Sequence, residues 1–331
     1  MDLRRGRDWL MLGWIGIKIR KFKAGGGKVI VITGSYGKTS VRELTYDLLR
    51  HKYRCLASSR NYNTAVGIAK TLRWELTPDI QYLILEVGAY RVGEITEFCR
   101  VLEPDIGVVT GIARQHLARF GSWEKIIQAK TEIVRCLDKN KGTLIANGSD
   151  VTVRQKIKKA LWYGGRERTE VNKDGAKKIA RSAGMSEAEI KKWTQTFRSV
   201  PNRFELTKKR YGMAAIDDAY NSNEKSLIEA VLYLGKQKKY TRILVTPGLL
   251  ELGTETERVH QKLGQQIVGQ ADYVMLVGKN ERTENLARGI DQRVPIIWLD
   301  KTLDFGKVTK ALKLKKDPLV LIENDVPVDL A

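Results

Sequence analysis

Cysteine, histidine and long apolar runs are scarce in this 331-residue chain. The three cysteines, Cys55, Cys99 and Cys136, are too few and too widely spaced for a disulfide framework or a CxxC metal pair, which favours free thiols in a reducing cytoplasm. No stretch approaches the roughly 18 apolar residues that span a bilayer, so a polytopic membrane protein is excluded. The remaining composition, 42% hydrophobic and 29% charged, is typical of a globular protein, and the length predicts two compact domains.

Acidic residues are also in deficit, because 59 Lys and Arg against 38 Asp and Glu leave a formal net charge of +21. Such an excess is compatible with nucleic acid, with an anionic membrane surface or with an anionic small substrate. The basic residues do not alternate with aromatic ones as they do in proteins that bind single strands. Nucleic acid is therefore the disfavoured partner, and solvated helix faces account for most of the charge.

Residues 1–27 are predicted to form a basic amphipathic helix, which Gly25-Gly26-Gly27 ends. Basic residues flank the apolar run Trp9–Ile17 on both sides, whereas a signal peptide has positive charge only before its apolar core. The run is too short to span a membrane. We expect the helix to pack on its own domain; the alternative is a peripheral membrane contact through residues 9–23.

A glycine-rich loop follows the first predicted strand. The β-branched run Lys28–Thr33 predicts a buried strand, and helical spacing begins at Val41. Between a strand and a helix, glycines let backbone N–H groups converge on phosphate oxygens beside the helix N-terminus. Ile32 stands where the general P-loop pattern has its first glycine, so this loop is a variant of that pattern. The residues predicted to bind ATP here are Thr33, Gly34, Ser35, Tyr36, Gly37, Lys38, Thr39 and Ser40.

Short apolar segments alternate with helical ones along the rest of the chain. The predicted strands cover 80–86, 105–110, 142–147, 213–217, 242–246, 273–277, 294–299 and 319–322. This alternation predicts an α/β protein: a P-loop-containing, mostly parallel sheet domain over residues 28–200, followed by a smaller Rossmann-like α/β domain over 201–331. Ligands collect at the carboxyl ends of parallel strands, where Glu86 and the loop after Thr110 are expected.

Further motifs follow the phosphate loop in a fixed order. They are Asn61–Gly67, Glu86–Ala89 with Gly93–Ile95, His116–Ser122, Gln128–Ile133, Asn202–Glu205, Asp217–Asn223 and Leu250–Gly253. Together with the loop, this series resembles the Mur ligase family of ATP-dependent amide ligases, most closely its MurF branch, over roughly residues 28–260. Because the motifs keep their order, the series is far more specific than any one of them.

The resemblance implies a two-step reaction. The carboxylate of a small-molecule acceptor attacks the γ-phosphate of ATP, and the amine of an amino acid or dipeptide then displaces phosphate from the acyl phosphate. It also implies that Lys130 is carbamylated, because an anionic oxygen ligand suits Mg²⁺ better than an ammonium group does.

The same resemblance assigns roles to individual residues. It implies Mg²⁺ ligands at Thr39, Glu86, His116 and Lys130, and catalytic roles for Lys38, His116, Lys130 and Arg203. Arg203, Asn221 and Asn223 would bind the nucleotide, and Asn61, Asn63 and Asp218 the substrate. Structural roles are expected for Glu251 and His260.

Departures from the family pattern concern substrate recognition. Only 27 residues precede Lys28, where relatives carry an N-terminal domain, and residues 151–200 form a shortened segment. We therefore expect complete ATP machinery in a ligase of cell-wall peptide or related metabolism, acting on a muramyl precursor or on a smaller or lipid-linked acceptor. The alternatives are a folylpolyglutamate- or cyanophycin-type ligase and a non-catalytic or partner-dependent ATP-binding subunit.

Overall fold

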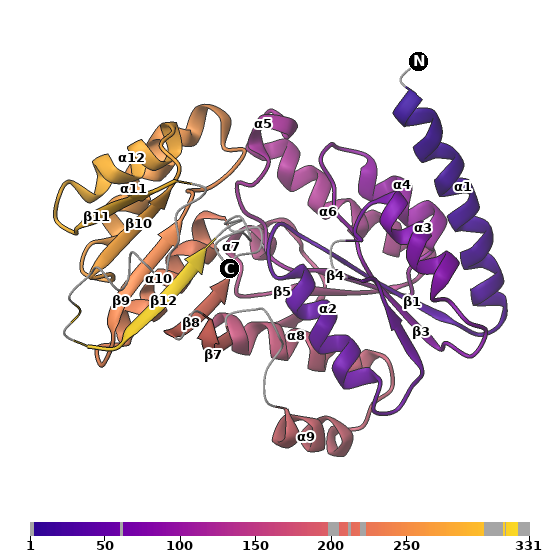
Figure 1. The fold of residues 1–331 in the computed structure, drawn as a ribbon. Helices are drawn as coiled ribbons and strands as arrows, with labels where there is room; N and C mark the ends of the chain where they lie inside the picture. The colour runs from indigo at the N-terminus through magenta and orange to yellow at the C-terminus, as the bar shows by residue number, and fades with distance from the viewer. Residues whose placement is uncertain are drawn as a thin grey trace. The chain divides into compact units, whose positions relative to one another are not determined.

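The computed structural model describes residues 3–59, 62–197, 205–210, 213–218, 223–300, 314 and 316–323. The chain forms two compact units (Figure 1). The first comprises Met1–Ile112 and Arg119–Arg198, and the second comprises Ala113–Ala118 and Ser199–Ala331. Each unit contains a six-stranded sheet, so the predicted α/β class with two sheet domains is confirmed.

The sheet of the first unit is parallel throughout, in the order β2-β3-β1-β4-β5-β6. Its strands are β1 (Lys28–Thr33), β2 (Cys55–Ala57), β3 (Tyr82–Glu86), β4 (Ile106–Val109), β5 (Thr143–Asn147) and β6 (Leu161–Tyr163). After its first residue β1 is buried, as expected of a central strand covered on both faces. The four predicted strands of this half are confirmed, whereas the two three-residue edge strands were not predicted.

Helices cover both faces of this sheet. Figure 1 shows α2 (Lys38–Leu49) with α8 (Arg168–Ser182) on one face, and α3 (Ala65–Trp74), α4 (Glu94–Leu102) and α6 (Trp123–Asn140) on the other. Right-handed crossovers that run in both directions from β1 produce this arrangement. The remaining helices are α1 (Leu3–Ala24), α5 (Leu117–Phe120), α7 (Val151–Lys156) and α9 (Glu187–Thr196).

Helix α1 packs on α3 and α4, which confirms the expectation that it packs on its own domain. Ile15 and Ile19 are fully buried, and Lys23 Nζ donates to Glu103 O at 2.6 Å. Among the described residues, no helix combines the length and the apolar character needed to cross a membrane.

The second sheet has the order β11-β10-β9-β12-β8-β7 and is parallel except where β7 pairs with β8. Its strands are β7 (Glu205–Arg210), β8 (Met213–Asp218), β9 (Thr241–Thr246), β10 (Tyr273–Val277), β11 (Ile296–Leu299) and β12 (Pro318–Glu323). One core joins the sheet to α10 (Glu224–Lys236), α11 (Thr256–Ile267) and α12 (Glu281–Ile290). All five strands predicted for this half are confirmed, and β7 was not predicted.

Candidate active site

The phosphate loop joins β1 to α2 in a conformation that glycine permits. Gly34 has a φ of +145° and Gly37 a φ of +82°. A Cβ at Gly34 would lie 2.2 Å from the hydroxyl oxygen of Thr110, so a larger residue does not fit. Helix α2 begins without a side-chain cap at Gly37, as is common where a helix N-terminus receives an anion.

Neighbouring strand ends hold this loop in place. The Thr110 hydroxyl donates to Tyr36 O at 2.6 Å, and Ser35 N donates to Gly111 O at 2.6 Å. The Tyr36 hydroxyl bonds the carboxylate of Asp150, which also caps α7. Sequence analysis missed Thr110 and Asp150, although a threonine at a strand end and an aspartate before a helix were the available signals.

Glu86 connects three segments at the carboxyl end of β3. It is 2% exposed, and it pairs with Ile32 next to the loop in the sheet register. Its carboxylate accepts hydrogen bonds from the Thr39 hydroxyl at 2.7 Å and from Asn63 Nδ2 at 3.3 Å, and it forms a 3.4 Å ion pair with Arg42. Arg42 was missed, although its position three residues after Thr39 places both on one helix face.

The donor pair at this site fits magnesium. The Thr39 hydroxyl and the Glu86 carboxylate offer hard oxygen ligands beside the phosphate loop. No group of three His, Cys, Asp or Glu in the described part of the chain could hold a metal by itself. A magnesium ion here would therefore take its other ligands from phosphate oxygens and water.

Lys130 lies on the buried side of α6 rather than on the helix surface. The side chain is 4% exposed, its Nζ donates to Ala89 O at 3.0 Å, and it lies 5.6 Å from the centre of the Phe120 ring. Burial, followed by the charge of Lys38, lowers the pKa of Lys130 from 10.5 to about 7. A large fraction of this amine is therefore neutral near pH 7.

Glu132, two residues further along α6, was missed by sequence analysis. Its carboxylate accepts hydrogen bonds from Gly93 N at 2.5 Å and from Thr96 N at 2.9 Å, at the start of α4. This contact satisfies N–H groups that a helix start leaves unpaired, and it fixes α4 against the helix that carries Lys130. The Gln128–Ile133 motif was the available signal.

His116 belongs to the second unit, where its ring contacts the carboxylate of Glu251. Both residues have positive φ angles, of 58° and 57°. The role of His116 as a magnesium ligand stays a prediction. His260 is fully buried, with Nε2 accepting from Leu249 N at 2.9 Å and Nδ1 donating to Thr256 O at 2.6 Å, and burial lowers its pKa. The structural role expected for His260 stays a prediction, and its burial and its two hydrogen bonds agree with it.

The structure describes only some of the residues that were predicted to bind nucleotide and substrate. Asn61, Arg203 and Asn221 lie outside the described residues, and Asp218 is described only as the last residue of β8. Asn223 is 2% exposed and caps α10, and its Nδ2 has no hydrogen-bond partner among the described residues. The nucleotide contact of Asn223 stays a prediction, as does substrate binding by Asn63.

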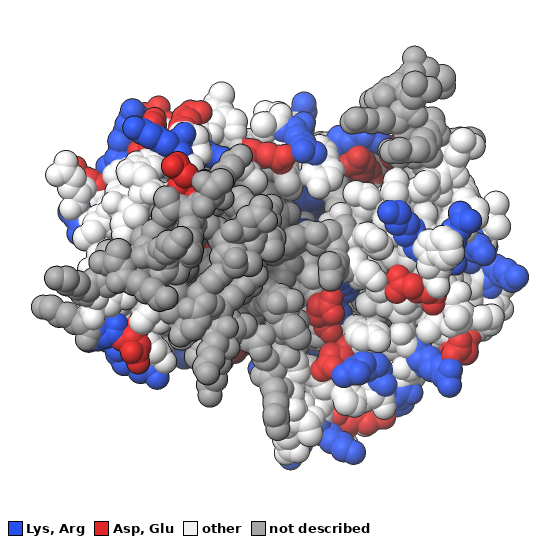
Figure 2. All heavy atoms as spheres, viewed as in Figure 1, with Lys and Arg blue, Asp and Glu red and all other residues white. Residues whose placement is uncertain are grey.

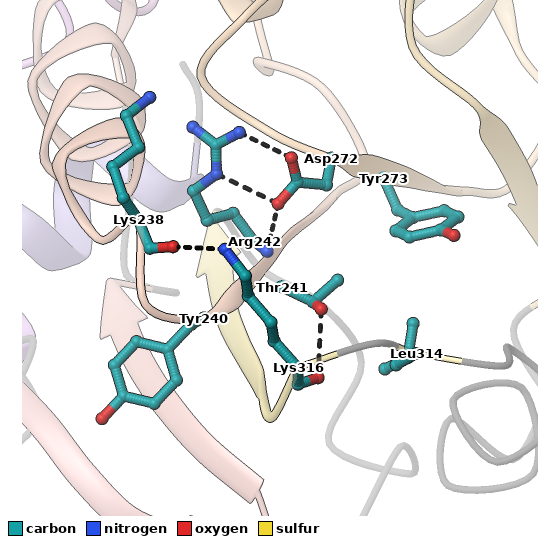
Figure 3. Close-up of a pocket in the computed structure, with 8 residues that line it drawn as sticks. All are labelled: Lys238, Tyr240, Thr241, Arg242, Asp272, Tyr273, Leu314 and Lys316. Carbon is teal, nitrogen blue, oxygen red and sulfur yellow. Dashed lines mark hydrogen bonds and ion pairs between the residues drawn. The ribbon is translucent and has the colours of Figure 1, made fainter.

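A separate cavity of about 360 Å³ lies in the second unit (Figure 3). Its polar groups already bind one another, because Arg242 pairs with Asp272 and Lys316 Nζ donates to Lys238 O at 2.8 Å. Thr241 and Tyr273 begin β9 and β10, so the cavity lies at the amino ends of these strands, away from the edge where ligands of such sheets collect. We assign it no role.

Two protein families match the chain in succession. The Mur ligase middle domain matches residues 32–207, and the family described as Mur ligase, glutamate ligase domain matches residues 202–325. The UDP-N-acetylmuramoyl-tripeptide--D-alanyl-D-alanine ligase of Escherichia coli (strain K12) is 28% identical over 319 residues, covering 83% of this chain and 69% of that protein. For a Haemophilus influenzae protein of the same name, the match covers only 61% of that protein's length.

Solved structures share the fold. MurF from Acinetobacter baumannii superposes with a TM-score of 0.80 at 22% identity, covering 95% of this chain and 76% of that one. MurF from Thermotoga maritima, solved in complex with ADP, gives a TM-score of 0.79 at 21% identity, covering 96% and 80%. The family matches agree with the motif series, and the solved structures agree with the fold. The chain belongs to the Mur ligase family, as its ordered motifs predicted.

Proposed function

We propose that this protein is an ATP-dependent carboxylate–amine ligase of the acid–amino-acid class, acting in cell-wall peptide synthesis. The observation that carries this proposal is the Thr39–Glu86 pair, 2.7 Å apart beside a preformed phosphate loop. The curated relatives are named for joining D-alanyl-D-alanine to a UDP-N-acetylmuramoyl-tripeptide. For this chain we propose the same substrate class, a peptide carboxylate and the amine of an amino acid or dipeptide.

In the first step, the acceptor carboxylate attacks the γ-phosphorus of ATP, and the bond to the ADP oxygen breaks. The loop N–H groups and Lys38 hold the phosphates in line and stabilise the negative charge that gathers on them. Thr39 and Glu86 would hold a magnesium ion, which neutralises charge on the β- and γ-phosphate oxygens when bound.

In the second step, the amine of the second substrate attacks the acyl carbon, phosphate leaves, and the nitrogen loses a proton as the amide forms. Lys38 and the loop again stabilise the departing phosphate oxygens.

We propose that Lys130 serves as its carbamate. The neutral amine attacks the carbon of CO₂, a C–N bond forms, and one proton leaves, so the side chain becomes an anion. The pKa of about 7 supports this step, because only the unprotonated amine has the electron pair that it requires. The modified side chain would present an oxygen ligand of the kind that Mg²⁺ prefers.

The test is ADP release by the purified full chain with ATP, an acceptor and an amine. Release that needs both substrates supports the ligase, whereas nucleotide binding without any turnover would support a non-catalytic subunit. Lys130→Ala should lower the rate more than about 100-fold, with partial recovery on adding formate. The exposed Lys125, on the same helix, gives the matched control Lys125→Ala. An unchanged rate in Lys130→Ala would overturn the role of the carbamate.

Two alternatives are less well supported. The names of the curated relatives disfavour a folylpolyglutamate-type ligase. On the face shown in Figure 2, the described Lys and Arg are interspersed with Asp and Glu, and the match to the Mur ligase middle domain disfavours a nucleic-acid protein.

We also propose that α1 contacts an anionic membrane surface. Leu10 and Ile17 are 70% and 61% exposed and lie seven residues apart, on one face of the helix. Lys18 and Lys21 are exposed near them, and residues 10–24 include no acidic side chain.

Sedimentation with phosphatidylserine-containing vesicles, but not with pure phosphatidylcholine, is expected for the intact chain. The double change Leu10→Glu with Ile17→Glu should abolish it, and Leu232→Glu is the control; equal binding by both variants would refute the contact.

A further inference from the structure

Helices α4 and α6 bring two of the three cysteines together. Thr96 of α4 donates to Glu132 of α6 through its hydroxyl at 3.0 Å and its backbone N–H at 2.9 Å. Both helices follow parallel strands and run in the same direction, so one further turn along each brings Cys99 beside Cys136. The two thiols are near enough to shift each other's pKa, Cys136 Sγ also donates to Glu132 O at 3.4 Å, and the two residues are 1% and 9% exposed.

The two thiols differ in acidity. The interaction with Cys99 lowers the pKa of the Cys136 thiol below its usual range. The same interaction, together with burial, raises the pKa of Cys99. Cys136 is also the more exposed of the two. A pair made of one nucleophilic thiol and one adjacent resolving thiol is the arrangement that converts an oxidised cysteine into a disulfide.

We propose that Cys99 and Cys136 form an oxidisable pair, which peroxide converts into an intramolecular disulfide joining α4 to α6. The Cys136 thiolate attacks one oxygen of hydrogen peroxide, which gives a sulfenic acid and releases hydroxide. The Cys99 sulfur then attacks the Cys136 sulfur, the S–O bond breaks, and water leaves with the proton of Cys99. Two thiols lose two electrons in total, and one peroxide is reduced to two waters.

This disulfide would lie close to the proposed active site without contacting it. Cys136 is six residues after Lys130 on α6, and Glu132 lies between them and holds the start of α4. The bond would close a loop from residue 99 to residue 136 and fix the two helices against each other. A reductant such as dithiothreitol would reverse it.

The test uses the full chain, treated with hydrogen peroxide, alkylated and digested for mass spectrometry. A linked pair of peptides that contain Cys99 and Cys136, two hydrogens lighter than their sum, is expected, with Cys55 still alkylated. This measurement on the unmodified sequence needs no variant. Full alkylation of Cys99 and Cys136 after treatment, or oxidation of Cys136 to a sulfinic acid without any linkage, would overturn the proposal.

Variants give a second measurement. Cys55 is a half-buried thiol on β2 whose pKa burial raises to about 12, so Cys55→Ser is the matched control and should still form the link. Cys99→Ser should form no link and should instead accumulate a sulfenic acid at Cys136 that dimedone traps. Oxidation should raise the melting temperature of wild type and Cys55→Ser by roughly 5 °C or more, reversibly with dithiothreitol. An equal rise in Cys99→Ser would refute the assignment.

Discussion

Replacing Lys130 with Met should stabilise the folded protein while it abolishes turnover. The side chain is 4% exposed, and its pKa is about 7 in the folded chain against an ordinary value of 10.5. Each unit of difference between folded and unfolded pKa values corresponds to about 1.4 kcal/mol. Burying this amine therefore costs on the order of 4 kcal/mol at pH 7, a cost that an uncharged side chain of similar length avoids.

Interactions lost in Lys130→Met offset part of this gain. The hydrogen bond to Ala89 O and the contact with the Phe120 ring together contribute about 1–2 kcal/mol. The variant is therefore expected to be more stable than the wild type by roughly 2–3 kcal/mol at pH 7.

The pH dependence identifies the cause. Between pH 7 and 10.5 the unfolded lysine binds a proton that the folded one does not, so the free energy of unfolding of the wild type rises with pH by about 1.4 kcal/mol per unit relative to the variant. The full cost is present below pH 7, and it disappears above pH 10.5. The advantage of Lys130→Met should shrink accordingly as the pH rises.

Urea unfolding of both proteins from pH 7 to pH 10, in buffer free of CO₂ and nucleotide and followed by circular dichroism, measures this difference. The exposed Lys125→Met is the control and should run parallel to the wild type at every pH. If the curves of wild type and Lys130→Met also ran parallel, or if the variant were the less stable protein at pH 7, the conclusion that Lys130 is held near neutrality by burial would be wrong.

Three other substitutions test the structure. Gly34→Ala should weaken ATP binding in calorimetry more than about 10-fold, because its φ of +145° and a hydroxyl 2.2 Å from the new Cβ leave no room; affinity equal to that of wild type would show that the loop adjusts. Gly264→Ala should destabilise the second unit by about 1–3 kcal/mol in thermal melts, because its Cβ would lie 2.4 Å from Leu286 O where α11 packs on α12; an unchanged melt would contradict that close packing. Asp272→Asn should cost about 1 kcal/mol at pH 7. The hydrogen bond from Arg242 lowers the pKa of Asp272, so this difference should vanish as the pH falls below 3.8; a constant difference down to pH 2 would assign the effect to packing.

The parts of the fold that the sequence predicts are those that local patterns encode. The β-branched run Lys28–Thr33 matches β1 at both ends because a central parallel strand is buried on both faces and needs such residues. The strands β2 and β6 were not predicted because each has only three residues, too few to show a period, and sits at an edge of the sheet.

Side-chain contacts between residues that are far apart in the sequence could not be predicted from local sequence patterns. The motif series predicted Thr39 beside Glu86, and the helical spacing places Arg42 on the same face as Thr39, but local sequence does not show that Arg42 is buried against a carboxylate 44 residues away. The nucleotide contact predicted for Tyr36 stays a prediction, and the bond from its hydroxyl to Asp150, 114 residues away, had no local signal. Such partners depend on how the strands are ordered in the sheet, and that order follows from packing over the whole unit.

The buried carboxylate of Glu86 bears on the order in which the ligands arrive. Arg42 already balances its charge, and Lys38 is close enough to Lys130 to lower the pKa of that amine. Lys38 and the backbone N–H groups of the loop attract a polyphosphate, whereas Glu86, paired with Arg42, offers a lone divalent cation little free negative charge. Magnesium should therefore enter already chelated by the nucleotide, so that the two arrive as one complex and neither ahead of the other.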